Sequence, residues 1–176
     1  STTMNLRLFL ALALTASAAR ADYFDDAVAA EEAGDDKKAF KLYKKSADKE
    51  RYLSAYYHVG HRYYLGSGVK RDFEEALKWF ERGAKSDNLA SITGLGVLYE
   101  DADYEGKDYA KARGYYMKAA EQWHPKALAC LGDMHKAGRG VPQDFLEAAL
   151  WRRLGAERGN VDAQFRFLRS AVQHLS

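Results

Sequence analysis

The amino-acid sequence predicts an all-α protein, a right-handed α/α superhelical solenoid built from antiparallel helix pairs. Three observations predict this class. The chain matches itself at an offset of 36 residues, apolar residues recur every three or four positions within each copy, and glycine-rich bends separate the apolar stretches. A fixed period of roughly 20–50 residues is typical of stacked repeats, in which each unit buries its apolar face against its neighbours.

The self-alignment divides the chain into repeats. At the offset of 36, glycines, aspartates and large aromatic residues align in threes: Gly60, Gly96 and Gly132; Asp72, Asp108 and Asp144; Trp79, Tyr115 and Trp151. We therefore expect full repeats at residues 52–88, 89–124 and 125–160. A shortened leading repeat is expected at 22–51, with Ala39, Tyr43 and Ala47 one residue out of register, and a C-terminal capping helix at 161–176, which gives about nine helices.

Each full repeat is expected to contain two helices joined by a bend. In the first copy, residues 52–65 and 72–84 both carry apolar residues at helical spacing. Asp72 and Asp144 each precede a Glu by three residues, which places their carboxylates at the N-cap of the second helix. The Gly-x-Gly-Val before each cap ends the first helix, because glycine adopts positive φ without strain. A phosphate-binding glycine loop would instead follow a strand and continue with Lys-Ser/Thr or a third glycine.

The bend of the middle repeat differs from the other two. Ala102 and Tyr104 stand where the other copies have glycine, and Gly106 follows two positions later. Because a residue other than glycine is strained at positive φ, we expect this bend to take a different path, with Asp101 and Asp103 exposed. Neutral variation of a surface loop and a partner-specific loop are both open interpretations.

The repeat pattern resembles a known family. A-x-x-x-L/V-G-x-x-Y, followed by G-x-G-V-x-x-D-F/Y-x-x-A-x-x-W/Y, at a 36-residue period, is similar to the Sel1-like repeat, a relative of the tetratricopeptide repeat. The resemblance covers about residues 52–160. It implies a helical solenoid in which the first helix of each pair lines a concave face that binds a protein or peptide partner.

Register and period also predict the core. The expected core residues are large and recur at equivalent positions: Tyr63, Trp79, Phe80, Tyr99, Tyr115, Tyr116, Leu131 and Trp151. The three aligned glycines are expected to let paired helices approach closely. Replacing Gly96 by a large residue is therefore expected to overpack that contact, at about 1–3 kcal/mol.

The N-terminal residues predict export. Residues 4–21 combine an arginine, an apolar run and a final Ala-Arg-Ala, the pattern of a secretory signal peptide, and Ser-Thr-Thr before Met4 is interpreted as a cloning remnant. We expect a periplasmic or secreted protein without a membrane span. Without residues 1–21 the chain has 27 − 2 = 25 basic and 25 acidic side chains. This balance argues against a nucleic-acid partner, which requires excess Lys and Arg.

No residue pattern predicts catalysis, and we expect neither a cofactor nor a metal. Cys130 is the single cysteine, interpreted as a buried helix residue, with an intermolecular disulfide as the alternative. His58 and His61 would place two rings toward one side of a helix but lack a third zinc ligand. The predicted function is an exported adaptor or scaffold. The alternatives are a secreted hydrolase, β-lactamase-like or acting on the cell wall, and a structural part of an envelope assembly.

The family resemblance places the partner on the first helices. The residues three before, one after and four after the aligned glycine would face the groove: Tyr57, His61, Tyr64, Thr93, Val97, Glu100, Ala129, Asp133 and Lys136, continued by Phe165 and Arg169 on the last helix. The first repeat offers amphipathic rings and the later ones mixed charge, which suits an extended or helical peptide. The alternative is that Tyr57 and Tyr64 only cover the neighbouring repeat.

Overall fold

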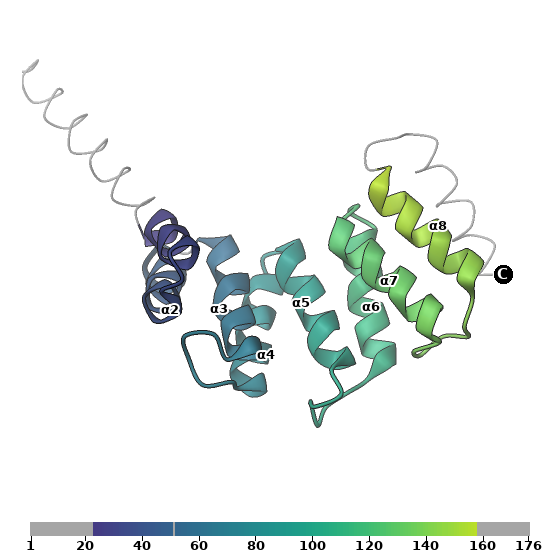
Figure 1. Ribbon diagram of the computed structural model, residues 1–176, viewed down its shortest axis with the longest axis horizontal. Helices are drawn as coiled ribbons and strands as arrows, with labels where there is room; N and C mark the ends of the chain where they lie inside the picture. Colours follow the sequence, from purple (N-terminus) through teal and green to yellow (C-terminus); the bar gives the residue numbers. More distant parts are fainter. Residues whose placement is uncertain (1–22, 51, 158–176) are drawn as a thin grey trace, which may run out of the picture. The chain divides into compact units, whose positions relative to one another are not determined.

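The structure is a computed structural model that describes residues 23–50 and 52–157 (Figure 1). The chain divides into two compact units between Asn88 and Leu89, and each unit is described by itself. All regular elements in the described residues are helical, with no strand among them, so the predicted all-α class is confirmed. None of these helices combines the length and the apolar composition that crossing a membrane requires.

Both units consist of consecutive helices joined by short bends. The first unit contains a helix over residues 23–32, α2 (Asp36–Lys45), the π-helical turn η1 (Ser46–Glu50), α3 (Leu53–Leu65) and α4 (Phe73–Ala84). The second unit contains α5 (Leu89–Glu100), α6 (Tyr109–Ala120), α7 (Pro125–Ala137) and α8 (Phe145–Ala156). Helix α3 packs on α4, α5 on α6 and α7 on α8, which are the two-helix repeats that the sequence predicts. The expected ninth helix lies outside the described residues.

An aspartate caps the second helix of every full repeat. Asp72 Oδ1 accepts a hydrogen bond of 2.9 Å from the backbone N–H of Glu75, as the spacing predicts. Asp108 and Asp144 do the same at 3.0 and 2.9 Å. The backbone N–H of Asp72 donates to the carbonyl of Tyr63 at 2.9 Å, and this bond recurs from Asp108 to Tyr99 and from Asp144 to His135. The cap residue therefore also fixes the second helix to the end of the first.

The Gly-x-Gly bends have the predicted conformation. Gly66 ends α3 at φ 75°, with its N–H bonded to the Arg62 carbonyl at 2.8 Å, and Gly68 follows at φ 73°. The later copy, Gly138 and Gly140, repeats these values at 66° and 69°. Glycine occupies this region without strain, so a side chain at any of these four positions is expected to be destabilising.

The middle bend follows another path, as expected, but one detail of the prediction is wrong. Asp101 is half-buried rather than exposed, and its carboxylate accepts a hydrogen bond from the Asp103 N–H at 2.8 Å. Asp103 is exposed. Tyr104, at a glycine position, is 8% exposed and packs edge-on against Tyr99 with ring centroids 5.8 Å apart. Tyr104 thus does not adopt the positive φ of the equivalent glycine, and its ring packs against Tyr99 instead.

The core agrees in part with the predicted one. Trp79, Phe80, Tyr116, Leu131 and Trp151 are buried, as predicted. Tyr63, Tyr99 and Tyr115 are half-buried instead; Tyr63 meets Phe40 edge-on at 5.2 Å, and Tyr99 and Tyr115 stack on each other at 5.7 Å. Several buried residues were not among those predicted from the repeat register: Tyr43, Ile92, Leu95, Leu98, Leu128 and Met134.

The aligned glycines lie where paired helices come closest. A Cβ added to Gly60 would lie 2.7 Å from Phe80 Cδ1, and one added to Gly96 would lie 2.6 Å from Tyr116 Cδ1. At Gly132 the neighbours are the Arg152 stem at 2.9 Å and the Ala148 carbonyl at 3.0 Å. The predicted close approach is therefore present in all three pairs.

Candidate functional site

Three predicted groove residues of α3 form one continuous aromatic surface. Tyr57, His61 and Tyr64 lie four and three positions apart, which places them on one side of the helix. The His61 ring stacks on Tyr57 with centroids 5.3 Å apart and lies 6.4 Å from the Tyr64 ring. All three side chains are half-buried. We call these three residues the aromatic stripe; that it binds a partner stays a prediction.

Two phenylalanine rings of α4 pack against the tyrosines of the aromatic stripe. Tyr57 lies 6.0 Å from Phe80, a core residue that is 1% exposed. Tyr64 lies 5.8 Å from Phe73. Burial, with a smaller contribution from the Glu31 carboxylate, raises the pKa of Tyr57 above its usual value, so its hydroxyl stays protonated at neutral pH. The stripe is therefore an aromatic surface supported by Phe80 and Phe73, and its two tyrosines carry hydroxyl groups.

The neighbouring histidine, His58, meets Tyr57 of the stripe edge-on at 5.5 Å but packs mainly on rings of the leading repeat. Its ring stacks on Tyr43 at 4.4 Å with an interplanar angle of 9°, and Phe24 contacts it edge-on at 5.4 Å. Burial lowers the pKa of His58 below its usual value. Within the described residues, no three His, Cys, Asp or Glu side chains are grouped as metal ligands. The rings of His58 and His61 therefore lie in different surroundings.

The predicted groove residues of α5 lie in different settings. Thr93 is only 3% exposed, and its hydroxyl donates to the Leu89 carbonyl at 2.8 Å and lies 2.9 Å from His124 Nδ1. Thr93 thus offers no accessible surface, because α5 is buried from residue 91 to residue 96. Val97 is half-buried. Glu100 accepts a 2.8 Å hydrogen bond from Tyr116 Oη and forms a 2.7 Å ion pair with Arg139 Nε.

The predicted residues of α7 are the most polar. Asp133 is half-buried and forms an ion pair with Arg152 of α8, Ala129 is half-buried, and Lys136 is exposed. Phe165 and Arg169 lie outside the described residues. The structure thus brings together the three residues of the aromatic stripe, whereas Glu100 and Asp133 are each held by an arginine of their own unit.

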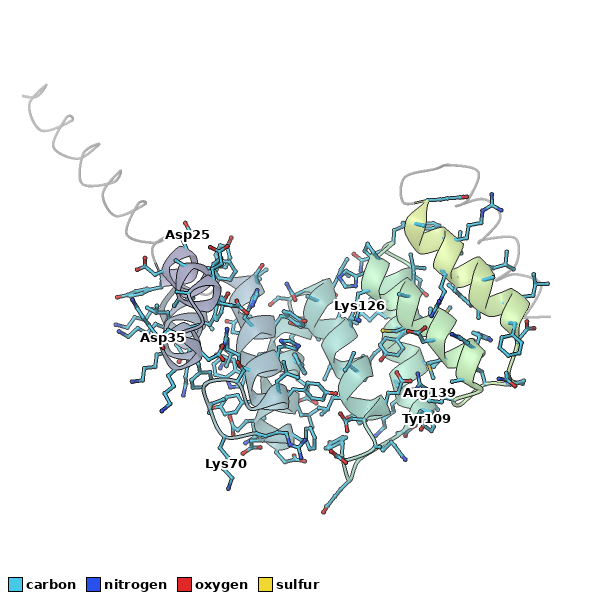
Figure 2. All side chains as sticks on the ribbon, viewed as in Figure 1. Asp25, Asp35, Lys70, Tyr109, Lys126 and Arg139 are labelled. Carbon is cyan, nitrogen blue, oxygen red and sulfur yellow. The ribbon has the colours of Figure 1, made fainter. Side chains whose placement is uncertain are left out.

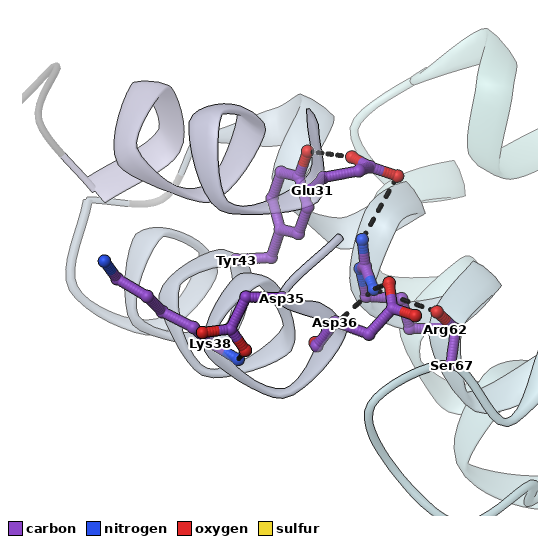
Figure 3. Close-up of polar contacts among 7 residues, drawn as sticks. All are labelled: Glu31, Asp35, Asp36, Lys38, Tyr43, Arg62 and Ser67. Carbon is purple, nitrogen blue, oxygen red and sulfur yellow. Dashed lines mark hydrogen bonds and ion pairs between the residues drawn. The ribbon is translucent and has the colours of Figure 1, made fainter. Parts of the chain in front are cut away.

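Sequence reasoning missed a buried arginine network in the first unit (Figure 3). The Arg62 side chain is 4% exposed and forms ion pairs with Glu31 at 3.1 Å and Asp36 at 3.0 Å. It also donates to Ser67 Oγ at 3.1 Å, and Tyr43 Oη donates to Glu31 Oε2 at 2.6 Å. The Arg62 guanidinium lowers the pKa of Asp36. One guanidinium thus links the leading repeat to the bend after α3.

The second unit contains a related arrangement. Tyr116 donates to Glu100, whose other oxygen pairs with Arg139, which is labelled beside Tyr109 in Figure 2. In both units, a glutamate that accepts a hydrogen bond from a tyrosine of its own repeat also forms an ion pair with an arginine of the following repeat. Burial raises the pKa of Tyr43 and of Tyr116 far above the usual value, so neither phenol ionises at neutral pH. These contacts hold neighbouring repeats together and place no activated nucleophile.

The single cysteine has the properties of a packing residue. Cys130 is 8% exposed and carries no disulfide. Burial raises the pKa of its thiol, which keeps the less reactive protonated form. A thiol nucleophile requires the opposite, an accessible site that favours the thiolate. The interpretation of Cys130 as a buried helix residue is therefore confirmed.

Comparison with known proteins agrees with the repeats seen in the structure. The family model described as Sel1 repeat matches residues 30–50, 53–88, 89–122 and 125–160. The chain belongs to the Sel1 repeat family. Sel1 repeat proteins are protein–protein interaction modules that bind protein partners.

Individual relatives match a large part of the chain. A solved structure of a Sel1 repeat protein from Oxalobacter formigenes is 34% identical, with a TM-score of 0.58, and the match covers 73% of this chain and 52% of that one. The ERAD-associated E3 ubiquitin-protein ligase component HRD3B of Arabidopsis thaliana is 32% identical over 65% of this chain and 18% of its own. Chitin synthase regulatory factor 2 of Schizosaccharomyces pombe is 29% identical over 76% of this chain and 28% of its own. This chain therefore spans less than a third of either curated relative.

Proposed function

We propose that this protein is an exported, non-enzymatic interaction module that binds a peptide segment of a protein partner through the aromatic stripe of α3. The observation that carries the proposal is the stack of Tyr57, His61 and Tyr64 on one side of that helix. Membership of the Sel1 repeat family supports a protein partner. The pattern of residues 4–21 supports export to the periplasm or the medium.

The physical properties of the stripe suit a binding surface. Aromatic rings supply large contact area at low entropic cost, because few rotatable bonds are immobilised on binding, and tyrosine is enriched among residues that dominate binding energy. Phe80 and Phe73 limit how far Tyr57 and Tyr64 can turn, so part of the ordering is complete before a partner arrives. The hydroxyl groups retain donors for the backbone carbonyls of an extended segment.

The test begins by identifying the partner. A photo-crosslinking residue in place of His61 is exposed to envelope and medium extracts, and the crosslinked protein is identified and purified. Its affinity is then measured for the wild-type chain and for a Tyr57→Ala, Tyr64→Ala double variant. We expect binding to weaken about 100-fold, since two tyrosines at the centre of an interface each contribute about 1–2 kcal/mol.

A matched control separates binding from stability. The Tyr99→Ala, Tyr115→Ala double variant removes two half-buried, stacked tyrosines from the second unit. It is expected to lose thermal stability but little affinity. Unweakened binding by a folded Tyr57→Ala, Tyr64→Ala variant would exclude the stripe as the contact. A fall in melting temperature larger than that of the control would show that these rings serve packing.

A further inference from the structure

A second surface of the first unit carries an unusual charge pattern. Helix α2 and the turn η1 contain six of the chain's 14 lysines, all exposed: Lys37, Lys38, Lys41, Lys44, Lys45 and Lys49. Ala39 and Tyr43 of the same helix are fully buried. At 100° per residue the lysines of α2 lie on the side opposite these two residues. We call these six residues the lysine face.

The described lysines of the lysine face form no ion pairs, although the exposed acids Asp35 and Asp36 stand at the start of the same helix. In the part of the chain whose side chains the structure describes, none of the six lysines forms an ion pair, and Lys45 lies 5.6 Å over the Tyr23 ring. Asp48 lies within the same sequence stretch but is directed to Arg82, 3.7 Å away on α4. The exposed lysines therefore repel one another at neutral pH, a cost that an anionic partner would relieve.

The repeat fold does not require lysine at these positions. The caps Asp35 and Asp72 align α2 with α4 at an offset of 72 − 35 = 37 residues. At that offset, Lys37, Lys38 and Lys44 correspond to Glu74, Glu75 and Glu81 of α4, whereas Lys41 and Lys45 correspond to the cations Lys78 and Arg82. The equivalent side of α4 thus carries both signs of charge, and its Lys78 and Arg82 are in ion pairs. The repeat fold therefore accepts acids at three of these positions, and an all-lysine face is not a consequence of repeat packing.

We propose that the lysine face binds the surface of an anionic phospholipid bilayer. All six cations are lysines, which act as point charges, whereas recognition of individual carboxylates or phosphates favours the two-pronged arginine. The lysines cover a wide arc of the helix, and a broad charged plane can meet more of them than a single peptide strand. Each lysine near an anionic membrane contributes about 1 kcal/mol. Among the exposed large apolar residues of the described chain, none lies on α2, so attachment is electrostatic and without insertion.

Local charge rather than net charge drives this attachment. The formal net charge of the chain is +2, and the helix over residues 23–32 carries exposed acids, Asp25, Asp26 and Glu32. These acids oppose the attraction, so the unit must orient with α2 toward the bilayer. The proposal is independent of the proposed function, because the aromatic stripe lies on α3 and is proposed to bind a protein partner rather than a bilayer.

Vesicle co-sedimentation of the full chain tests the proposal. Binding to vesicles of phosphatidylcholine mixed with phosphatidylglycerol is compared with binding to pure phosphatidylcholine, which serves as the baseline for any apolar contribution. Attachment is expected only to the anionic vesicles and is expected to be lost at about 1 M salt, where the screening length falls to about 3 Å. Equal binding to both vesicles, or binding that resists salt, would overturn the proposal.

Three substitutions localise the attachment. The Lys38→Gln, Lys41→Gln, Lys45→Gln variant is expected to bind about 100-fold more weakly, or about fivefold for each lysine. The control, Lys70→Gln, Lys85→Gln, Lys126→Gln, removes the same charge from exposed lysines elsewhere and is expected to change binding less than about threefold. A Lys→Arg triple at positions 38, 41 and 45 keeps the charge and should retain binding. Equal losses in both glutamine variants, loss in the arginine variant, or attachment to poly-L-glutamate or duplex DNA but not to vesicles would each refute the lipid assignment.

Discussion

The glycine contact between α5 and α6 makes a stability prediction that can be worked out from the structure. In Gly96→Ala, the new Cβ would lie 2.6 Å from Tyr116 Cδ1 and closer still to Cε1. Ordinary carbon contacts begin near about 3.5 Å, so the ring must move by about 1 Å. Tyr116 is fully buried and its hydroxyl is bonded to Glu100, which restricts that movement. We therefore expect Gly96→Ala to be destabilising.

Two opposing effects set the magnitude. Replacing glycine by alanine inside a helix stabilises it by about 1 kcal/mol, whereas overpacking a filled core costs about 1–3 kcal/mol. Gly114 of α6 provides the matched control, because a Cβ there meets nothing within 4 Å. Gly114→Ala should therefore show the helix gain alone. The difference between the two variants isolates the overpacking cost of about 1–3 kcal/mol.

Thermal and urea unfolding followed by circular dichroism measure both variants. For a chain of this length, 1 kcal/mol shifts the melting temperature by about 2–4 °C, so Gly96→Ala should melt several degrees below Gly114→Ala. Tyr116→Leu removes the ring that the new Cβ would meet. The double variant Gly96→Ala, Tyr116→Leu should therefore be more stable than the sum of the two single destabilisations predicts. The reasoning fails if Gly96→Ala is as stable as Gly114→Ala.

Two further predictions concern titratable groups. Burial lowers the pKa of His58 in the folded state, so below pH of about 6.5 the unfolded chain binds more protons and stability falls as the pH falls. His58→Phe keeps a ring against Tyr43 and should flatten the stability profile between pH 7 and pH 5, as measured by urea unfolding; an unchanged slope would contradict this assignment. The Cys130 thiol, buried and with a raised pKa, should react with a thiol reagent in native buffer at the rate of unfolding, and rapid labelling of the folded chain would show that the site is accessible.

Much of the fold is predictable from the sequence because the same residue types recur at equivalent positions of several repeats. One aspartate before a helix is weak evidence, but Asp72, Asp108 and Asp144 at a fixed period are strong evidence, and each caps its helix in the structure. The half-burial of Tyr63, Tyr99 and Tyr115 was not predictable in this way. Period fixes which side of a helix a residue faces, but the exposed fraction depends on side chains contributed by neighbouring helices.

The candidate site was predictable only where helix spacing alone decides it. Tyr57, His61 and Tyr64 share one side of α3 because of their spacing, and their rings meet for that reason. The setting of Thr93 depends on His124, 31 residues away, which no local pattern indicates. The network of Arg62 was detectable in principle, because its register partners are the buried Leu98 and Met134, so a charged residue stands at a core position. Such a residue is stable in a core only with paired carboxylates.

The register of the leading repeat shows how a small sequence irregularity becomes structure. Ala39, Tyr43 and Ala47 are one residue out of phase with later repeats, yet all three are fully buried. The interval from Ala84 to Leu89 is 89 − 84 = 5 residues, whereas the equivalent interval from Ala47 to Leu53 is 53 − 47 = 6. The π-helical turn η1 lies across this interval, and a π turn accommodates one residue more than an α turn. The π turn accommodates the extra residue at the end of α2, so it does not change which side of α2 faces α3. The apolar side of α2 therefore packs on α3, and its lysines are exposed.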